Sequence, residues 1–362
     1  MPLCNRLPAS ARRKGYSLST VAEVAALAGV SPSTVSRVLS GKALTLVSDA
    51  TQVRVRDAAA RLGYRPSAAA RALATGRAAT IAFCCYHAYD SGMSRLLRAV
   101  HDLATEAGYY LLLVHPKSTD DVARLLIEER ADAVVWVRYP VHEADALMPS
   151  RGAPHQVVVA IGETQDDRAP EDVFSVAWDD GLGMRQILQH LTSLGHRDIT
   201  FLQGHAPATN PKVYAFKRAC QALGLPCDTL CCADESDRIG AGMAMAQRLL
   251  RRRQRPTALV ARVDDFAFGA IYALQEAGLA VPADMSVVGY HNTPEAAHFH
   301  PPLTSVRTPE LQGVAALMPT ALAALDRGPD ELVSPACLRL ETDLIVRNST
   351  GPARGNTDRE RG

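Results

Sequence analysis

The chain has 362 residues, 47% of them hydrophobic and 21% charged, a composition that excludes a disordered or membrane-embedded protein. Its net charge of +1 hides a separation along the sequence. Residues 1–78 contain 12 Lys and Arg against three acids, a net charge of +9, whereas the remainder carries 27 against 35, a net charge of −8. A basic segment of this kind suits a polyanionic partner such as DNA, because Lys and Arg neutralise phosphates and release counterions.

The length exceeds the ~250–300 residues at which a single hydrophobic core stops growing, so we expect two or three domains. No apolar stretch reaches about 18 residues, which argues against a membrane span. The first 17 residues are basic but carry no apolar run, so they do not resemble a secretory signal. We therefore expect a cytoplasmic protein.

Two short helices joined by a tight turn are predicted near the N-terminus. Thr20-Val-Ala-Glu23 has the spacing of a capping box, which begins a helix, and Gly29 supplies a turn residue. Ser31 and Pro32 then open a second helix as N-cap and first residue. This is helix-turn-helix geometry, and a third helix is expected from Ser48 to Leu62. The polar face of the second helix carries short groups suited to base edges and phosphates, namely Ser33, Thr34, Ser36 and Arg37.

The segment from Thr20 to Lys42, TVAEVAALAGVSPSTVSRVLSGK, together with LGYRP at 62–66, resembles the DNA-binding domain of the LacI/GalR family of transcriptional regulators. A basic helical hairpin without this function is the alternative. The resemblance implies that Pro32, Ser33 and Arg37 face bases in the major groove. It places four residues near phosphates, namely Thr20, Ser31, Thr34 and Ser48. The loop 41–47 is about two residues longer than the usual loop of the family.

The segment 67–75 is rich in good helix formers, but its length is below the ~12–15 residues at which an isolated helix persists in water. We expect it to be helical only when it is supported. The resemblance implies a hinge helix that forms when two subunits meet on the operator, with Leu73 wedged into the minor groove and Arg71 also at the DNA. A flexible alanine-rich linker is the alternative.

From Thr80 onward, β-rich runs alternate with amphipathic helices, which predicts two lobes, each a parallel sheet flanked by helices. The resemblance implies a two-lobed α/β domain of the periplasmic-binding-protein type. Ligands of parallel sheets bind beyond the carboxyl ends of the strands, so a site between the lobes is expected. The predicted strands are 81–85, 110–114, 133–137, 157–161, 199–202, 258–261 and 286–290. The predicted helices are 93–107, 120–130, 181–194, 212–223, 238–252 and 265–278.

The domain organisation follows from these segments. We expect a helix-turn-helix domain at 18–66, a hinge at 67–78 and a two-lobed effector-binding and dimerisation domain at 79–349. Residues 1–17 and 350–362 are expected to be disordered. The resemblance also implies three crossings between the lobes, near Asp179, Thr304 and Pro329.

The expected effector site departs from that of sugar-responsive family members, which carry an Arg, an Asn and an Asp where this chain has Lys212, Val263 and His291. Lys offers a point charge, and His can donate to an anion or become cationic. We therefore predict an anionic effector such as a sugar acid, a sugar phosphate or a small carboxylate. A neutral sugar bound by other residues, or no effector, remains open. Further residues assigned to the site are Tyr86, Asp90, Trp178 and Asp264.

The resemblance predicts a homodimer on a pseudo-palindromic operator, since a two-fold pair of readers mirrors the DNA. We expect no enzyme, because no nucleophile and base or paired carboxylates can be singled out. We also expect no cofactor and no metal, since the eight cysteines lack the spacing of a zinc site. A solute-binding protein would share the two lobes without needing the basic module, and an enzyme that uses the cleft is the other alternative.

Overall fold

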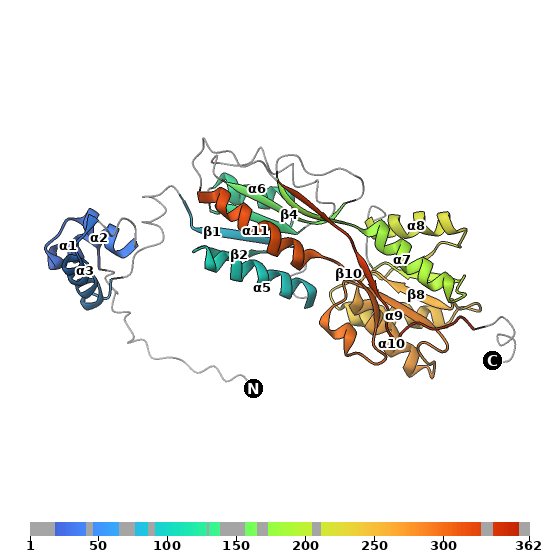
Figure 1. The fold of residues 1–362 in the computed structure, drawn as a ribbon. Coiled ribbons are helices and arrows are strands. Elements are labelled where there is room, and N and C mark those ends of the chain that lie inside the picture. The colour runs from blue at the N-terminus through green and yellow to red at the C-terminus, as the bar shows by residue number, and fades with distance from the viewer. Residues whose placement is uncertain are drawn as a thin grey trace, which may run out of the picture. The chain divides into compact units, whose positions relative to one another are not determined.

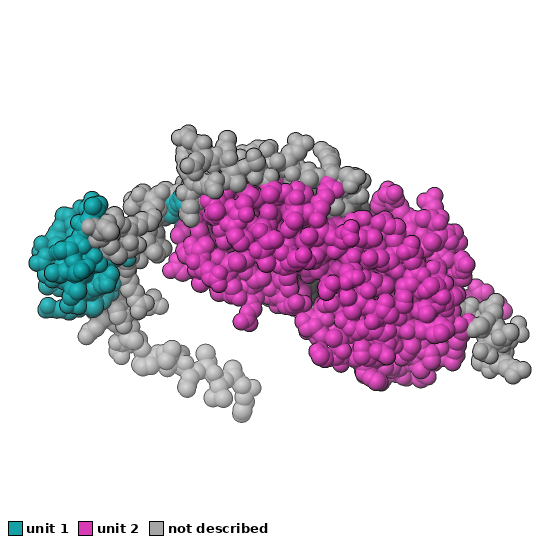
Figure 2. Space-filling model, in the orientation of Figure 1, with its two compact units in different colours: residues 1–78 teal, residues 79–362 magenta. Residues whose placement is uncertain are grey.

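The computed structural model describes residues 19–40, 46–64, 77–85, 91–128, 130–137, 156–164, 173–204, 211–326 and 336–354. The chain separates into two compact units, residues 1–78 and 79–362 (Figure 2). None of the helices in the described ranges is both long and apolar enough to cross a membrane.

The described part of the first unit contains the helices α1 (Val21–Ala28), α2 (Pro32–Ser40) and α3 (Asp49–Arg61). The predicted capping box is present, since Thr20 caps α1 and the Glu23 carboxylate accepts from the Thr20 backbone N–H at 2.7 Å. Gly29 ends α1 with φ +64°, a conformation that glycine adopts without steric cost. The three helices bury a small aliphatic core that includes Val24, Val35 and Val55.

The first lobe of the second unit is built on a six-stranded parallel sheet in the order β11-β5-β4-β3-β1-β2. Both faces of the sheet are covered by helices, so its central strands are continuous apolar runs such as AVVWV in β3. The strands are β1 (Thr80–Cys85), β2 (Tyr110–Val114), β3 (Ala133–Val137), β4 (Val157–Thr164), β5 (Phe174–Asp179) and β11 (Cys337–Leu340). The helices are α5 (Ser91–Glu106), α6 (Thr119–Ile127) and α11 (Glu310–Asp326).

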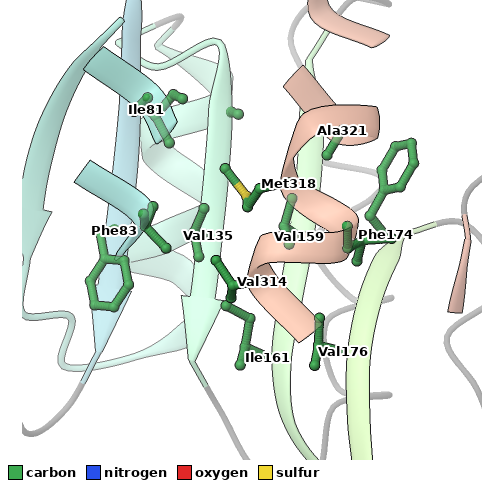
Figure 3. Close-up of a cluster of buried hydrophobic side chains, with 14 of the residues drawn as sticks. Ile81, Phe83, Val135, Val159, Ile161, Phe174, Val176, Val314, Met318 and Ala321 are labelled. Carbon is green, nitrogen blue, oxygen red and sulfur yellow. The ribbon is translucent and has the colours of Figure 1, made fainter. Parts of the chain in front are cut away.

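Successive side chains of each strand point to opposite faces of this sheet. Ile81 and Phe83 of β1 point to the same face as the apolar side chains of α5 and α11, and Val314 and Met318 of α11 complete that layer (Figure 3). The intervening residues of β1 pack with Leu126 of α6 on the other face. This alternation gives the first lobe two apolar layers around one sheet.

The second lobe repeats this architecture with the strand order β12-β10-β9-β8-β6-β7, in which β12 alone runs antiparallel to its neighbour. One face packs against α9 and α10, and the other against α7 and α8. The strands are β6 (Ile199–Leu202), β7 (Asp228–Leu230), β8 (Ala258–Ala261), β9 (Ser286–Tyr290), β10 (Thr304–Arg307) and β12 (Asp343–Ile345). The helices are α7 (Asp180–Ser193), α8 (Pro211–Leu223), α9 (Arg238–Leu250), α10 (Asp264–Glu276) and the short η3 (Pro294–Ala297).

The chain passes between the lobes at three places, two of them where the sequence predicts. The first crossing joins β5 to α7 at Asp179, and the second joins β10 to α11 just beyond Arg307. The third lies between β11 and β12, at Glu341 and Thr342, later in the chain than the predicted position near Pro329. The red strand that runs through both lobes in Figure 1 is this last crossing.

The chain continues past residue 349 as an ordered segment, in contrast to the disorder expected from residue 350 onward. The backbone N–H of Gly351 donates to the Ser286 hydroxyl at 3.0 Å, and that of Ala353 donates to the Leu194 carbonyl at 2.8 Å. Residues 350–354 therefore belong to the second lobe. Residues 1–17 and 355–362 lie outside the described residues.

Candidate functional site

The helix α2 presents a polar surface to solvent above its apolar core. Val35 and Val38 are buried, whereas Ser33, Ser36 and Arg37 are exposed. These side chains are on the outer face because the helical repeat of 3.6 residues places the two valines on the inner one. The start of the helix is also exposed, with Ser31 and Pro32 open to solvent and Thr34 half-buried.

Hydroxyl side chains lie at the N-termini of all three helices, and those of Thr20 and Ser31 accept from a backbone N–H of the first turn, whereas that of Ser48 does not. The Ser31 hydroxyl accepts from the Thr34 backbone N–H at 3.2 Å, as Thr20 does at the start of α1. Ser48 precedes α3, and its hydroxyl is 2.9 Å from that of Thr51. A helix N-terminus with exposed hydroxyls and a positive dipole end is suited to bind phosphate. The N-cap residues for which we predict phosphate contacts, Thr20, Ser31 and Ser48, thus lie at helix N-termini of this kind.

Several predicted site residues lie outside the described residues. These are Arg71 and Leu73 of the expected hinge, together with Tyr86 and Asp90 of the expected effector site. Most of the longer loop 41–47 also lies outside, apart from Leu46 and Val47.

Lys212 and His291, which are 79 residues apart in sequence, meet in the second lobe. The Lys212 ammonium lies 3.0 Å from Nε2 of His291, and Nδ1 of the same ring lies 3.2 Å from the Thr308 hydroxyl. Lys212 is the second residue of α8, His291 follows β9 and Thr308 follows β10, so the contacts form where the strands end at their carboxyl edge. We call Lys212, His291, Thr308 and Glu310, which begins α11 in the first lobe, the interlobe cluster.

Electrostatics determine the charge of this histidine. Burial lowers the pKa of His291 well below its ordinary value, and the positive charges of Lys212, Arg238 and Arg262 lower it further. The ring is therefore neutral, which differs from the cationic state that the sequence leaves open. A neutral ring accepts from Lys212 at Nε2 and donates from Nδ1 to Thr308. Lys212 thus supplies the positive charge of this pair.

The backbone at His291 is strained, with φ +93°, and that of Asn292 has φ +46°. Two hydrogen bonds hold this conformation: the His291 N–H donates to the Val306 carbonyl at 2.8 Å, and the Asn292 N–H donates to the Ser305 hydroxyl at 3.0 Å. Non-glycine residues with positive φ persist where the surrounding structure fixes them, and they gather at binding sites. From this conformation the ring of His291 contacts Lys212.

Glu310 brings a carboxyl group of the first lobe to this cluster. Burial raises the pKa of Glu310, while a hydrogen bond from Thr308 and the charges of Arg95 and Lys212 oppose the rise. Its Oε2 is buried and accepts no hydrogen bond from the residues that the structure describes. A buried acceptor in this state favours a ligand whose hydroxyl group donates a hydrogen bond to it.

Lys212 is also linked to the first crossing between the lobes. Its ammonium lies 4.5 Å from the centre of the Tyr290 ring, and the Tyr290 hydroxyl donates to Oδ1 of Asp180 at 2.7 Å. Asp180 is the first residue of α7, directly after the crossing at Asp179. Tyr290 and Asp180 are both buried.

The other assigned effector residues that the structure describes, Val263, Asp264 and Trp178, make contacts of a different kind. Val263 is the N-cap of α10 and offers no side-chain cap. Asp264 uses both carboxyl oxygens within the lobe, accepting from the Thr293 N–H and the Ser305 hydroxyl, each at 2.6 Å. Trp178 packs in the core of the first lobe.

The Trp178 ring also borders a pocket of about 700 Å³ at the junction of the lobes. Its walls come from the ends of β5 and β11 and from the helices α7 and α8, including Arg185, Tyr214 and Arg339. Neither Lys212 nor His291 lines this pocket. It is therefore distinct from the interlobe cluster.

Sequence reasoning missed Thr308, Tyr290 and Glu310, together with three charged residues at the carboxyl edge of the second sheet. Those three are Glu235, Arg238 and Arg262. Arg262 directly follows β8, and a polar residue directly after a predicted strand is the signal that could have identified it.

Two family models match the chain: residues 17–67 match "Bacterial regulatory proteins, lacI family", and residues 188–350 match "Periplasmic binding protein-like domain". A curated relative, the HTH-type transcriptional repressor PurR of Actinobacillus pleuropneumoniae, is 31% identical over 92% of this chain and 98% of its own length. A solved complex of the transcriptional regulator CelR with cellobiose is 26% identical, with a TM-score of 0.61 over 91% of this chain and 99% of that one. The lac repressor dimer bound to operator and an anti-inducer has the same fold, with 24% identity and a TM-score of 0.75 over 92% and 99%.

Proposed function

The chain belongs to the LacI family of DNA-binding transcriptional regulators, and we propose that it is a repressor whose operator affinity is set by an anionic, hydroxylated effector at the interlobe cluster. The observation that carries the effector proposal is the placement of Lys212 between the neutral His291 ring and the Tyr290 face. Curated relatives matched along most of the chain, such as PurR and DegA, are named as a transcriptional repressor and a transcriptional regulator, and we propose that this chain is likewise a regulator and no enzyme. The cytoplasm, where its DNA partner lies, is the proposed location.

The first unit supports binding to double-stranded DNA. Its net charge of +9 is accompanied by an exposed polar face on α2 and by hydroxyl groups at the helix starts. We propose that Ser33, Ser36 and Arg37 read bases and that the N-caps hold phosphates. Beyond the described residues, Leu73 is proposed as a minor-groove wedge and Arg71 as a further DNA contact.

The edge of the first sheet supports a homodimer. β2 is the edge strand, and Tyr110, Leu112 and Leu113 are exposed on it. An exposed apolar edge strand favours association unless something covers it. The operator complex of the lac repressor is named as a dimer, and we propose a two-fold dimer of this chain on a pseudo-palindromic operator.

The interlobe cluster supports the chemistry of the effector. Lys212 supplies a buried positive charge from the second lobe, and Glu310 offers a buried acceptor from the first. A molecule with an acidic group and hydroxyls, such as a sugar acid or a sugar phosphate, satisfies both lobes at once. Because its two ends contact different lobes, its binding favours one interlobe arrangement over others.

A thermal-shift screen of neutral sugars, sugar acids and sugar phosphates, with release of operator DNA as a second readout, tests this proposal. We expect the anionic compounds to stabilise the protein and to change DNA affinity, and Lys212→Ala to abolish both responses. Lys217→Ala is the matched control, since Lys217 is an exposed lysine on the same helix. If only neutral sugars act and Lys212→Ala responds as the parent does, the proposed effector class is wrong. If no compound acts, an effector-independent regulator is indicated.

A further inference from the structure

A second charged cluster lies in the same lobe and consists of Glu235, Arg238 and Arg262, which we call the arginine cluster. One carboxylate oxygen of Glu235 accepts from Nη2 of Arg262 and lies 4.0 Å from Nε of Arg238. These side chains are only 11–14% exposed. Ion pairs in such surroundings are weakly screened by solvent, so their charges act strongly on whatever binds beside them.

The arginine cluster lies where parallel sheets of this type bind ligands. The chain leaves β6 for its outer neighbour β7 and then returns to β8 on the opposite side, so the strand order reverses between β6 and β8. Arg262 directly follows β8, and Gly204 lies just beyond the end of β6. A Cβ at Gly204 would lie 2.5 Å from Oε1 of Glu235, so the carboxylate rests against the end of β6. Ligands of open parallel sheets bind in the crevice at this switch point.

The charges of the arginine cluster reach the interlobe cluster. The positive charges of Lys212, Arg238 and Arg262 all lower the pKa of His291, so the two clusters are close enough to act on the same ring. Within these two clusters the second lobe contributes three cations against the single carboxylate of Glu235. Glu310 of the first lobe adds a second carboxylate, so the two clusters together hold three cations and two carboxylates. If Glu235 were displaced by a ligand, Arg238 and Arg262 would be left facing that ligand with two positive charges.

We infer that the arginine cluster receives a doubly charged phosphoryl group of the effector, and that Glu235 occupies the place of that group in the ligand-free protein. This inference rests on the proposed effector function. Planar guanidinium groups present paired N–H donors that match phosphate oxygens, and a phosphate dianion in the place of Glu235 would carry one negative charge for each of the two arginines, whereas a ligand carboxylate carries only one. Glu235 thus holds the two arginines in position and competes with the incoming phosphate.

Calorimetric titration of the full chain with methyl phosphate, the smallest phosphate monoester, tests this competition, with succinate and glucose as comparison probes. Glu235→Gln removes the competing charge and keeps the shape, so we expect methyl phosphate to bind at least fivefold more tightly than to the parent. The double variant Glu235→Gln with Arg262→Gln removes an arginine together with the carboxylate it pairs with, and it should bind at least tenfold more weakly than Glu235→Gln. Asp343→Asn is the matched control, because it removes a surface carboxylate paired with Arg307 at 2.7 Å, and it should stay within twofold of the parent.

The inference is overturned if Glu235→Gln binds methyl phosphate no more tightly than the parent, if neither protein binds it, or if succinate shows the same responses. These outcomes are separable from failure of the effector proposal. If Lys212→Ala abolishes the response to anions while the Glu235 and Arg262 variants change nothing, the effector site stands without the arginine cluster. If the Glu235 and Arg262 variants behave as expected but methyl phosphate and larger sugar phosphates leave DNA binding unchanged, the phosphoryl site exists and the regulatory role fails.

Discussion

The hydrogen bond from Tyr290 to Asp180 gives the most direct quantitative test of how the second lobe is stabilised. Both residues are at most 2% exposed, and the hydroxyl donates to the carboxyl oxygen over 2.7 Å. Hydrogen bonds to charged groups contribute about 1.5–3 kcal/mol, and removing a buried donor also costs the desolvation of its acceptor. We therefore expect Tyr290→Phe to lower the free energy of unfolding by about 2 kcal/mol. For a domain of this size that corresponds to a fall of roughly 5 °C in the unfolding temperature.

Urea unfolding of the full chain, followed by far-UV circular dichroism, measures this effect. Tryptophan fluorescence serves as a comparison, because Trp136 and Trp178 both pack in the first lobe. Tyr272→Phe is the control, since Tyr272 is 48% exposed and its substitution should change stability by less than about 0.5 kcal/mol. A Tyr290→Phe variant that unfolds within about 0.5 kcal/mol of the parent would refute the assigned role of this hydrogen bond.

Three further outcomes follow from other parts of the molecule. Burial raises the pKa of Asp264 to about 7, so the folded protein retains a proton that the unfolded chain releases near pH 4. The free energy of unfolding should therefore fall as the pH rises from about 4 to about 7, by at most about 4 kcal/mol. In urea titrations across this pH range, Asp264→Asn should flatten the slope. Thr20→Ala removes one half of the capping box and should cost about 1 kcal/mol, seen as roughly fivefold faster amide exchange in residues 21–28 with no change beyond residue 79. Arg37→Ala should relax base preference by about 1–3 kcal/mol in competition binding to operator variants, and equal losses on every sequence would show that Arg37 contacts only phosphate.

The first unit was predictable because its signals are local. The capping box at Thr20 and Glu23, the glycine turn at Gly29 and the serine and proline at the start of α2 each act within one helical turn, and all are found as predicted. The central strands of both sheets were predictable for a similar reason. Strands buried on both faces need continuous apolar runs, which are visible without knowledge of their partners.

The crossing elements could not be predicted from local pattern. β11 and β12 are short and largely half-exposed, and their pairing with β5 and β10 depends on residues more than 30 positions away. The helix α11 contains Pro319, which in sequence indicates a helix boundary. It is tolerated here because the helix packs its apolar face, including Val314 and Met318, on the first sheet. Tertiary packing thus decides these elements and moves the third crossing to Glu341 and Thr342.

The charge state of the site was equally hidden from the sequence. The positions of Lys212 and His291 follow from the family resemblance, but the ionisation of His291 depends on burial and on cations from three other elements. Two of those cations, Arg238 and Arg262, are separated in sequence and meet only because β7 and β8 flank β6 in the sheet. Composition and spacing give the residue types of such a site, whereas the fold sets how their charges combine.

The contacts from Lys212 through Tyr290 to Asp180 also suggest how occupation of the site reaches the crossing between the lobes. An anion at Lys212 competes with the Tyr290 ring for the ammonium, and Tyr290 is bonded to the first residue of α7, directly after the crossing. Tyr290→Phe keeps the aromatic face and removes only the hydroxyl, so it should leave the affinity for an anionic effector nearly unchanged. If this line of contacts carries the signal, the same variant will alter the release of DNA at saturating effector. Effector binding shifts the equilibrium between two interlobe arrangements only if the contacts differ between them. The hydrogen bond between Tyr290 and Asp180 is one such candidate contact, and the effect of its loss on DNA release can be measured separately from effector affinity.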